Sequence, residues 1–311
     1  MKQRYLTFIS FFTLSFGIVI LSCGNSTEEE STIQNTLFSA ASNEQFNDYW
    51  YKGKAEIVTY ELAQARYGEI HEGTAVQIFV SEPFNVTKQV KSDRQTDRDV
   101  NAFKMNLTRK FNTGIYPYSV MTSAFNTVNT NDPSEIIKVT NSSQEWCGHT
   151  WSQMNRSKKG FDYTLYSYFE SESDISSELN SFMSEDGLWS QVRMNPSLLP
   201  QGNLEIIPGL HFLRFRHLPA KPYAAKAEIV TSDDYNTYVI TYSEIRRTFK
   251  INYQPTFPFQ LISWEEIYPS GFGSGADMVS TTGKAIHTEL LPYWELNSKS
   301  DSVYRKQIKL D

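Results

Sequence analysis

Hydrophobic and polar residues alternate along several stretches of the chain, and this alternation predicts β-strands. The clearest stretch is 247–253, in which Phe249, Ile251 and Tyr253 alternate with polar residues. Because successive side chains of a strand point to opposite faces, a period of two is typical of a strand with one buried face. Residues 161–169 show the same pattern. Further strands are predicted at 54–60, 75–80, 104–111, 118–125, 135–140, 145–154, 211–218, 227–231, 238–243 and 259–266.

Helical periodicity is confined to short parts of the chain. The best candidate is 174–194, where Leu179 and Met183 recur at helical spacing and Gly187 divides the segment. Residues 60–67 fit a short helix or a strand equally well. Strands that follow one another without alternating helices favour antiparallel pairing. We therefore predict a mainly β fold, an antiparallel curved open barrel or sandwich, with a short helical insert at about 174–194.

The N-terminal segment predicts a secretion signal. Lys2 and Arg4 precede an apolar stretch at 6–21, and Ser22 comes directly before Cys23. A charged start, a short apolar core and a small residue at the cleavage site describe a signal peptide. The apolar stretch is shorter than the roughly 18–20 residues of a membrane-spanning helix, so a transmembrane anchor is the poorer interpretation.

Residues 20–24 resemble the lipobox of bacterial lipoproteins, in which the cysteine becomes the lipidated first residue of the mature chain. The resemblance implies that residues 1–22 form a lipoprotein signal peptide and that acyl chains such as palmitate attach to Cys23. Each buried methylene adds about 0.8 kcal/mol, so several chains hold a domain at a membrane. We expect a lipid anchor in the outer membrane, with the domain on either its periplasmic or its cell-surface face.

The region after the signal divides into a tether and one domain. Residues 23–45 are predicted to contain the lipidated cysteine and a flexible tether, of which the polar stretch 24–36 has a reach of about 20 Å. The acidic residues 28–30 resemble the surface-export signal of Bacteroidetes lipoproteins. Residues 46–311 are predicted to form a single β-rich domain that contains the helical insert.

Composition limits the partners. The formal net charge is −6, and loss of the signal, which carries Lys2 and Arg4, makes the mature chain more acidic. An acidic balance argues against nucleic acid as a partner, because binding requires a basic face that neutralises phosphates. The charged fraction of 21% and the aromatic fraction of 14% fit a folded domain. The membrane is therefore expected as a partner through the lipid on Cys23.

The candidate catalytic residues are Glu145, Cys147 and His149. With Cys23 assigned to the lipid, Cys147 is the one thiol left in the mature chain. On a single strand the three side chains would share a face. They could then form a nucleophilic thiol with a histidine base, a metal site or a ligand-contacting surface. The alternative is a buried, inert thiol beside a hydrogen-bonded histidine, packed between two tryptophans.

Other polar residues also have alternative interpretations. On the predicted strand 211–218, His211 and His217 would share one face, while Arg214 and Arg216 would share the other and meet an anionic ligand, carboxylates of the sheet or solvent. Glu265 and Glu266 would point to opposite faces, which makes them poor partners for each other. (Both expectations depend on these segments being strands.)

Two further patterns carry little chemistry. The glycine-rich stretch 271–275 lacks the spacing of a phosphate-binding loop and is interpreted as a mobile loop. Residues 54–59 reappear letter for letter at 226–231, which indicates either a duplicated sheet or two similar strands. The H-E-x-x-H, C-x-x-C and G-x-S-x-G motifs do not occur. We therefore predict neither a metal nor a cofactor.

Four runs of the chain, 50–56, 65–69, 110–119 and 144–150, resemble an uncharacterised family of Bacteroidetes lipoproteins. Some members of that family are labelled septum formation inhibitor Maf. Maf proteins proper are nucleotide pyrophosphatases with an N-terminal Ser-x-Ser-x-Arg-Arg loop, which this sequence lacks. The resemblance therefore implies an envelope lipoprotein without an assigned activity.

The leading functional hypothesis is a non-enzymatic, membrane-anchored envelope lipoprotein. A curved sheet with a helical insert could bind an apolar ligand, as carriers of the LolA type do, or an envelope protein; this rests on analogy of fold. The alternative is a hydrolase or transferase that uses Cys147 and His149, or a metal site at these residues.

Overall fold

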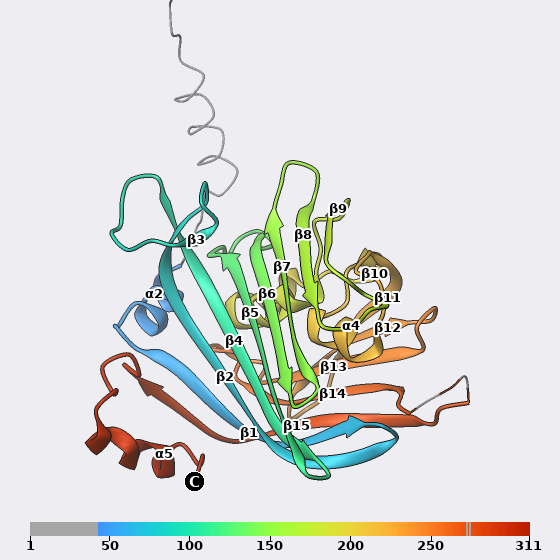
Figure 1. The fold of residues 1–311 in the computed structure, drawn as a ribbon. Helices are drawn as coiled ribbons and strands as arrows, with labels where there is room; N and C mark the ends of the chain where they lie inside the picture. The colour runs from blue at the N-terminus through green and yellow to red at the C-terminus, as the bar shows by residue number, and fades with distance from the viewer. Residues whose placement is uncertain (1–42, 272, 274) are drawn as a thin grey trace, which may run out of the picture.

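The computed structural model describes residues 43–271, 273 and 275–311 (Figure 1). The predicted signal peptide, Cys23 and nearly all of the predicted tether lie outside the described residues. The predicted fold class is confirmed, because the domain is built on one large, unclosed antiparallel sheet with a few short helices. Among the described residues, no helix combines the length and the apolar character that crossing a membrane requires.

The sheet contains 15 strands, most of which pair with their neighbours in the sequence. Its order is β10-β11-β12-β13-β14-β15-β1-β2-β4-β5-β6-β7-β8-β9, and β3 pairs with β2 at the side. The first and last strands, β1 and β15, therefore meet in the middle and join two halves of the sheet. The strands are β1 (Ala55–Arg66), β2 (Glu69–Asn85), β3 (Val90–Lys91), β4 (Asp99–Thr113), β5 (Tyr116–Thr127), β6 (Ile136–Glu145), β7 (Gly148–Arg156), β8 (Phe161–Ser167), β9 (Ile175–Leu179), β10 (Gly202–Ile206), β11 (Tyr223–Thr231), β12 (Asn236–Tyr242), β13 (Arg247–Tyr253), β14 (Leu261–Pro269) and β15 (Met278–Leu291).

The helices are short and fall into three groups. α2 (Glu44–Trp50) precedes β1, and η3 (Lys299–Ser302) with α5 (Val303–Gln307) follows β15. Residues 180–222, here called the insert, contain the remaining helices and the edge strand β10. The insert lies between the strands β5–β8 and the strands β12–β14 (Figure 1). Its helices are η1 (Glu185–Gly187), α3 (Leu188–Met194), η2 (Pro196–Leu198) and α4 (Leu210–Arg216).

Several strand predictions are confirmed, above all 247–253, which coincides with β13. The helix predicted at 174–194 is correct only in its second half, since β9 occupies its first part. Gly187 does divide the segment, because η1 ends at this residue and α3 begins at Leu188. Residues 60–67 belong largely to the strand β1 and not to a helix.

The strand predicted at 211–218 is wrong, because these residues form most of the helix α4. The helix buries five of its seven residues, so hydrophobic residues occur on nearly all of its sides and the helical period is hidden. A short apolar run of this kind cannot be told from a buried strand by periodicity.

The repeated six residues occupy different environments. In β1 the stretch 55–60 is buried throughout, whereas in β11 the stretch 227–231 is mostly exposed or half-buried. The outer face of β1 is covered near the C-terminus, where the hydroxyl of Thr59 donates to the carbonyl of Ile308 at 2.6 Å. Position in the sheet, rather than local sequence, decides burial here.

The core fills the space between the insert and the concave side of the sheet. Trp189 of α3 packs against the rings of Phe249 and Trp264 at centroid distances of 5.3 and 6.3 Å. Arg193 of the same helix donates to both carboxylate oxygens of Glu56 in β1, inside the protein. The insert is thus fixed to the sheet by aromatic packing and by a fully buried ion pair.

Candidate functional site

The three candidate catalytic residues do not meet on one face. Glu145 ends β6 and His149 lies in β7, because residues 146–147 form a tight turn that reverses the chain. The single strand predicted at 145–154 is therefore wrong. Glu145 lines a cleft inside the curve of the sheet, whereas His149 is exposed and pairs with exposed Gln144.

The thiol of Cys147 is exposed, unlike the buried thiol considered from the sequence. Its backbone N–H donates to the carboxylate of Glu145 at 2.7 Å. A hydrogen bond with that carboxylate, reinforced by its charge, raises the pKa of the Cys147 thiol. An activated nucleophile requires the opposite shift. Within the described residues, no group of three or more His, Cys, Asp or Glu side chains is arranged to hold a metal ion.

The residues of α4 also lie elsewhere than predicted. His211 is buried above the ring of Phe215 at 4.2 Å, and burial lowers its pKa well below the usual range. His217 ends the helix in the left-handed region and lies 2.6 Å from the carboxylate of Glu172. Arg214 reaches the same carboxylate at 3.1 Å. The two histidines therefore occupy separate environments, one dry and one exposed.

Glu265 and Glu266 do point to opposite faces, as predicted. Glu265 pairs with Lys250 on the outer face at 2.8 Å. Glu266 points inward and accepts hydrogen bonds from Arg109 at 2.8 Å and from Arg247 at 3.0 Å.

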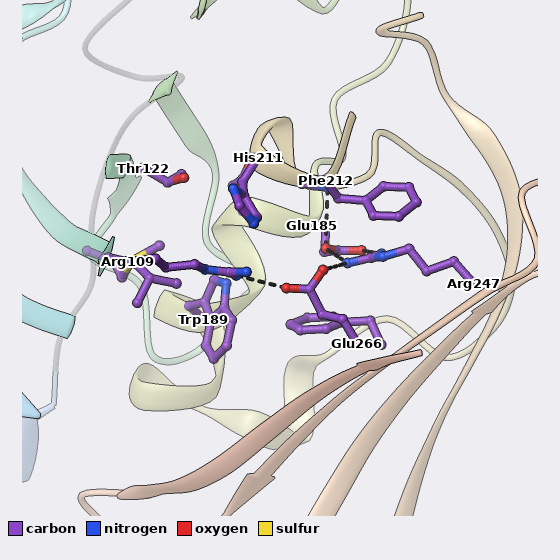
Figure 2. A pocket seen from close by; sticks show the side chains of 13 residues that line it. Arg109, Thr122, Glu185, Trp189, His211, Phe212, Arg247 and Glu266 are labelled. Carbon is purple, nitrogen blue, oxygen red and sulfur yellow. Dashed lines mark hydrogen bonds and ion pairs between the residues drawn. The ribbon is translucent and has the colours of Figure 1, made fainter. Parts of the chain in front are cut away.

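Glu266 belongs to a buried ionic network that joins the insert to the sheet (Figure 2). Arg247 of β13 binds both Glu266 of β14 and the carboxylate of Glu185 in η1. Arg109 of β4, in the other half of the sheet, forms an ion pair with Glu266 and completes the network. The hydroxyl of Tyr242 donates to Glu185 at 2.8 Å. The network is thus charge-balanced and joins three separate parts of the sequence.

The network keeps Glu266 ionised. Burial alone would raise the pKa of Glu266, but the charges of Arg109 and Arg247 outweigh it and lower the pKa to about 2. Asp186, next to Glu185, has no ion pair with an arginine among the described residues. Its carboxyl accepts a hydrogen bond from the N–H of Leu210 at 2.9 Å, but burial outweighs this contact and raises the pKa of Asp186 to about 7.

The cavity at the network is too small for an organic ligand. It has a volume of about 20 Å³, enough for roughly one water molecule. Nδ1 of His211 and one terminal nitrogen of Arg109 have no hydrogen-bond partner among the described residues. We therefore interpret the ionic network as a structural contact that holds the insert against the sheet.

A much larger cavity of about 570 Å³, here called the end cleft, lies where α4 ends beside three strand turns. Its polar residues include Arg66 at the end of β1, Arg214 and Glu145. Five aromatic side chains dominate the lining, namely Tyr67, Tyr116, Tyr118, Phe169 and Phe215.

Tyr67 and Arg66 form the organised centre of the end cleft. The Arg66 guanidinium lies 4.4 Å from the ring centroid of Tyr67 and 4.5 Å from that of Phe215. The hydroxyls of Tyr67 and Tyr118 are 2.8 Å apart. Burial would raise the pKa of Tyr67, but the hydrogen bond with Tyr118 and the charge of Arg66 outweigh it and lower the pKa.

Few features of the sequence indicate the end cleft. Tyr67 and Gly68 form the two-residue turn between β1 and β2, a position that a strand–Xaa–Gly–strand pattern can locate. The pattern cannot show that Tyr118 and Phe215 lie opposite, since these contacts join residues far apart in the sequence. Of the predicted site residues, Glu145 and Cys147 line the end cleft and His149 does not.

A scan against protein-family models, a search of the curated proteins and a search of the solved structures each find no match for this chain. The resemblance to Bacteroidetes lipoproteins therefore stays a prediction. Function has to be argued from the geometry of the described residues.

The ionic network should contribute strongly to stability. Replacing Arg247 with Met should lower the free energy of unfolding by about 3–5 kcal/mol, because the buried carboxylate of Glu185 loses its arginine and that of Glu266 loses one of two. Replacing Lys250 with Met on the outer face of the same strand should cost less than about 1 kcal/mol, since Lys250–Glu265 is a partly exposed pair. Urea unfolding of the full chain measures the free energy of unfolding of both variants. Equal losses of stability would contradict a network that is buried away from water.

Asp186 should make stability depend on pH. Its pKa is about 7 in the folded protein against an ordinary 3.8, so the fold retains the proton that the unfolded chain loses. The resulting stabilisation is complete below about pH 4 and is lost as pH rises through 7. The unfolding free energy of Asp186→Asn relative to wild type should therefore rise by up to about 4 kcal/mol between pH 4 and pH 8. A difference independent of pH would show that Asp186 is ionised in the fold.

The carboxylate of Glu145 should suppress the reactivity of Cys147. In Glu145→Gln the thiol pKa should fall, and alkylation by iodoacetamide at pH 7.5 should become severalfold faster. The control is Glu178→Gln, a change at an exposed position on β9. Mass spectrometry of the modified peptide follows the rate, and an unchanged rate in Glu145→Gln would contradict the assigned contact.

Proposed function

We propose that the protein is a lipid-anchored binding protein of the outer membrane and that its ligand occupies the end cleft. The observation that carries the proposal is a cavity of about 570 Å³ lined by five aromatic rings and a few charged side chains. Small-molecule sites usually have volumes of about 300–1,000 Å³, an apolar lining and a few placed polar groups.

The concave side of the sheet is a poor alternative location for the ligand. The insert fills it with large buried side chains such as Trp189, Leu210 and Phe212. The cavity left in its polar centre holds roughly one water molecule. The apolar ligand expected from the curved sheet is therefore assigned to the end of the sheet and not to its interior.

The rim of the end cleft also favours an apolar or aromatic ligand. Trp146 is 67% exposed in the β6–β7 turn, and its ring stacks near that of Tyr116 at 6.2 Å. Ile115, in the β4–β5 turn, is 85% exposed. Exposed hydrophobic residues that gather around a cavity are typical of binding surfaces.

The position of α2 fits an anchored protein whose cleft points away from its anchor. The described chain begins next to α2, where Phe46 and Trp50 pack on the ring of Phe103 at 5.5 and 4.7 Å. Phe103 lies ten residues before Thr113 on β4, roughly 33 Å at the usual rise of a strand. Tyr116 and Tyr118 of the end cleft pair with Thr113 and Phe111, near the other end of β4, so the start of the described chain and the cleft lie toward different ends of β4.

Hydrolase or transferase chemistry at Cys147 and His149 has no comparable support. The thiol pKa is raised by Glu145, and His149 lies on the outer face of the hairpin. We therefore do not extend the proposal to catalysis.

Filling the end cleft should abolish binding. Ser143 is buried on the inner face of β6 and lines the cleft, whereas Ser142 points to the outer face. Ser143→Trp should remove a small molecule that copurifies with the full chain from its own envelope, and Ser142→Trp should retain it. Native mass spectrometry detects the bound mass, and thermal unfolding checks that both variants are folded.

A titration with 2-naphthol covers the case in which the natural ligand is lost during purification. Wild type and Ser142→Trp should bind this neutral aromatic probe, and Ser143→Trp should not. A wild-type protein that carries no ligand and does not bind 2-naphthol would overturn the proposed function.

A further inference from the structure

A second cavity of about 210 Å³ adjoins the end cleft, and we call it the basic pocket. The two cavities share Arg66, Tyr67, Phe215 and His217, so these residues form the partition between them. Arg216 also lines the basic pocket, and none of its described lining residues is an aspartate or a glutamate. The pocket therefore has cationic walls without a built-in counter-charge.

The absence of a counter-charge distinguishes Arg66 and Arg216 from the other shielded arginines. Both are half-buried, yet neither has a carboxylate within ion-pair distance among the described residues. Burying an unpaired charge is costly, so proteins normally pair it. Such pairing with a glutamate is present for Arg109, Arg156, Arg193, Arg214 and Arg247.

Hydrogen-bond donors are also in excess in the basic pocket. Arg66 donates to the carbonyl of Phe215 at 2.7 Å and to the hydroxyl of Tyr67 at 3.4 Å, but its Nε–H has no acceptor among the described residues. The guanidinium of Arg216 has no hydrogen-bond acceptor within the described part of the chain, and burial lowers its pKa. Ser270 accepts the N–H of Gly68 at 3.2 Å, which leaves its hydroxyl hydrogen for another acceptor.

We propose that the basic pocket binds the anionic head group, a phosphate or a carboxylate, of the ligand whose apolar or aromatic body occupies the end cleft. Arginine donates in a planar fork that matches such oxyanions. The rings of Tyr67 and Phe215 hold Arg66 in place before the ligand arrives, which limits the entropy lost on binding. The placement of the ligand's apolar body in the end cleft rests on the proposed function, whereas the placement of its anionic head group in the basic pocket does not.

Three small probes test the two parts separately by calorimetric titration of the full chain: inorganic phosphate, phenol and phenyl phosphate. Phenyl phosphate, which combines both groups, should bind at least roughly tenfold more tightly than either of the others, because charge-assisted hydrogen bonds contribute about 1.5–3 kcal/mol. Arg216→Gln should remove that advantage and leave phenol binding unchanged, because Arg216 does not line the end cleft. Arg66→Gln should remove the advantage and also weaken phenol binding, because Arg66 lines both cavities. The matched control is Arg94→Gln, an exposed arginine in the β3–β4 loop.

Each outcome decides between the parts of the proposal. The side chain of Arg216 makes no hydrogen bond to the described residues, so its replacement tests the pocket even if Arg66→Gln fails to fold. Two results would contradict anion binding in the basic pocket and leave the proposed end-cleft site standing. One is equal affinity of the wild type for phenol and phenyl phosphate, and the other is an unchanged affinity of Arg216→Gln for phenyl phosphate. Phosphate binding that depends on Arg216, without any binding of phenol, would support the basic pocket and contradict the proposed function.

Discussion

The buried ion pairs of Arg247 with Glu185 and Glu266 set the position of the insert, and the rest of the interior depends on them. Glu185 begins η1, while Arg109 brings β4 from the other half of the sheet to Glu266. The neighbouring carboxyl of Asp186 receives the first N–H of α4 at Leu210. The network therefore determines where α4 begins, and hence where its last turn meets the strand ends that form the end cleft.

The arginines of this domain divide according to whether the protein supplies their counter-charge. Inside, pairs such as Arg193 with Glu56 are complete, because the loss of hydration of a buried charge has to be offset by close partners. At the end of the sheet, Arg66 and Arg216 remain half-buried without a carboxylate partner in the described part of the chain. The same electrostatic rule applies to both groups of arginines. In the interior the protein's own glutamates supply the counter-charge, and in the basic pocket an anion from outside would supply it, as proposed above.

The sequence predicted the local features well and the long-range ones poorly. Alternation located β13 and correctly placed Glu265 and Glu266 on opposite faces, because both follow from the geometry of one strand. It failed at α4, which is buried on nearly all sides, and at the turn of residues 146–147, whose two central residues are a tryptophan and a cysteine and not turn formers. It could not reveal the ion pairs, since Arg109 and Glu266 are 157 residues apart.

The turn at Tyr67 shows how the end cleft and the fold constrain each other. Tyr67 and Gly68 have φ 56° and 86°, the positive values at both positions that a type I′ hairpin turn requires and that favour asparagine or glycine. The left-handed region costs a side chain roughly 1–2 kcal/mol. The contacts of Tyr67 with Tyr118 and Arg66 offset this cost. An asparagine would relax the turn but remove the ring that lies nearest to the Arg66 guanidinium, so the strained tyrosine helps to keep the cation in position between the two cavities.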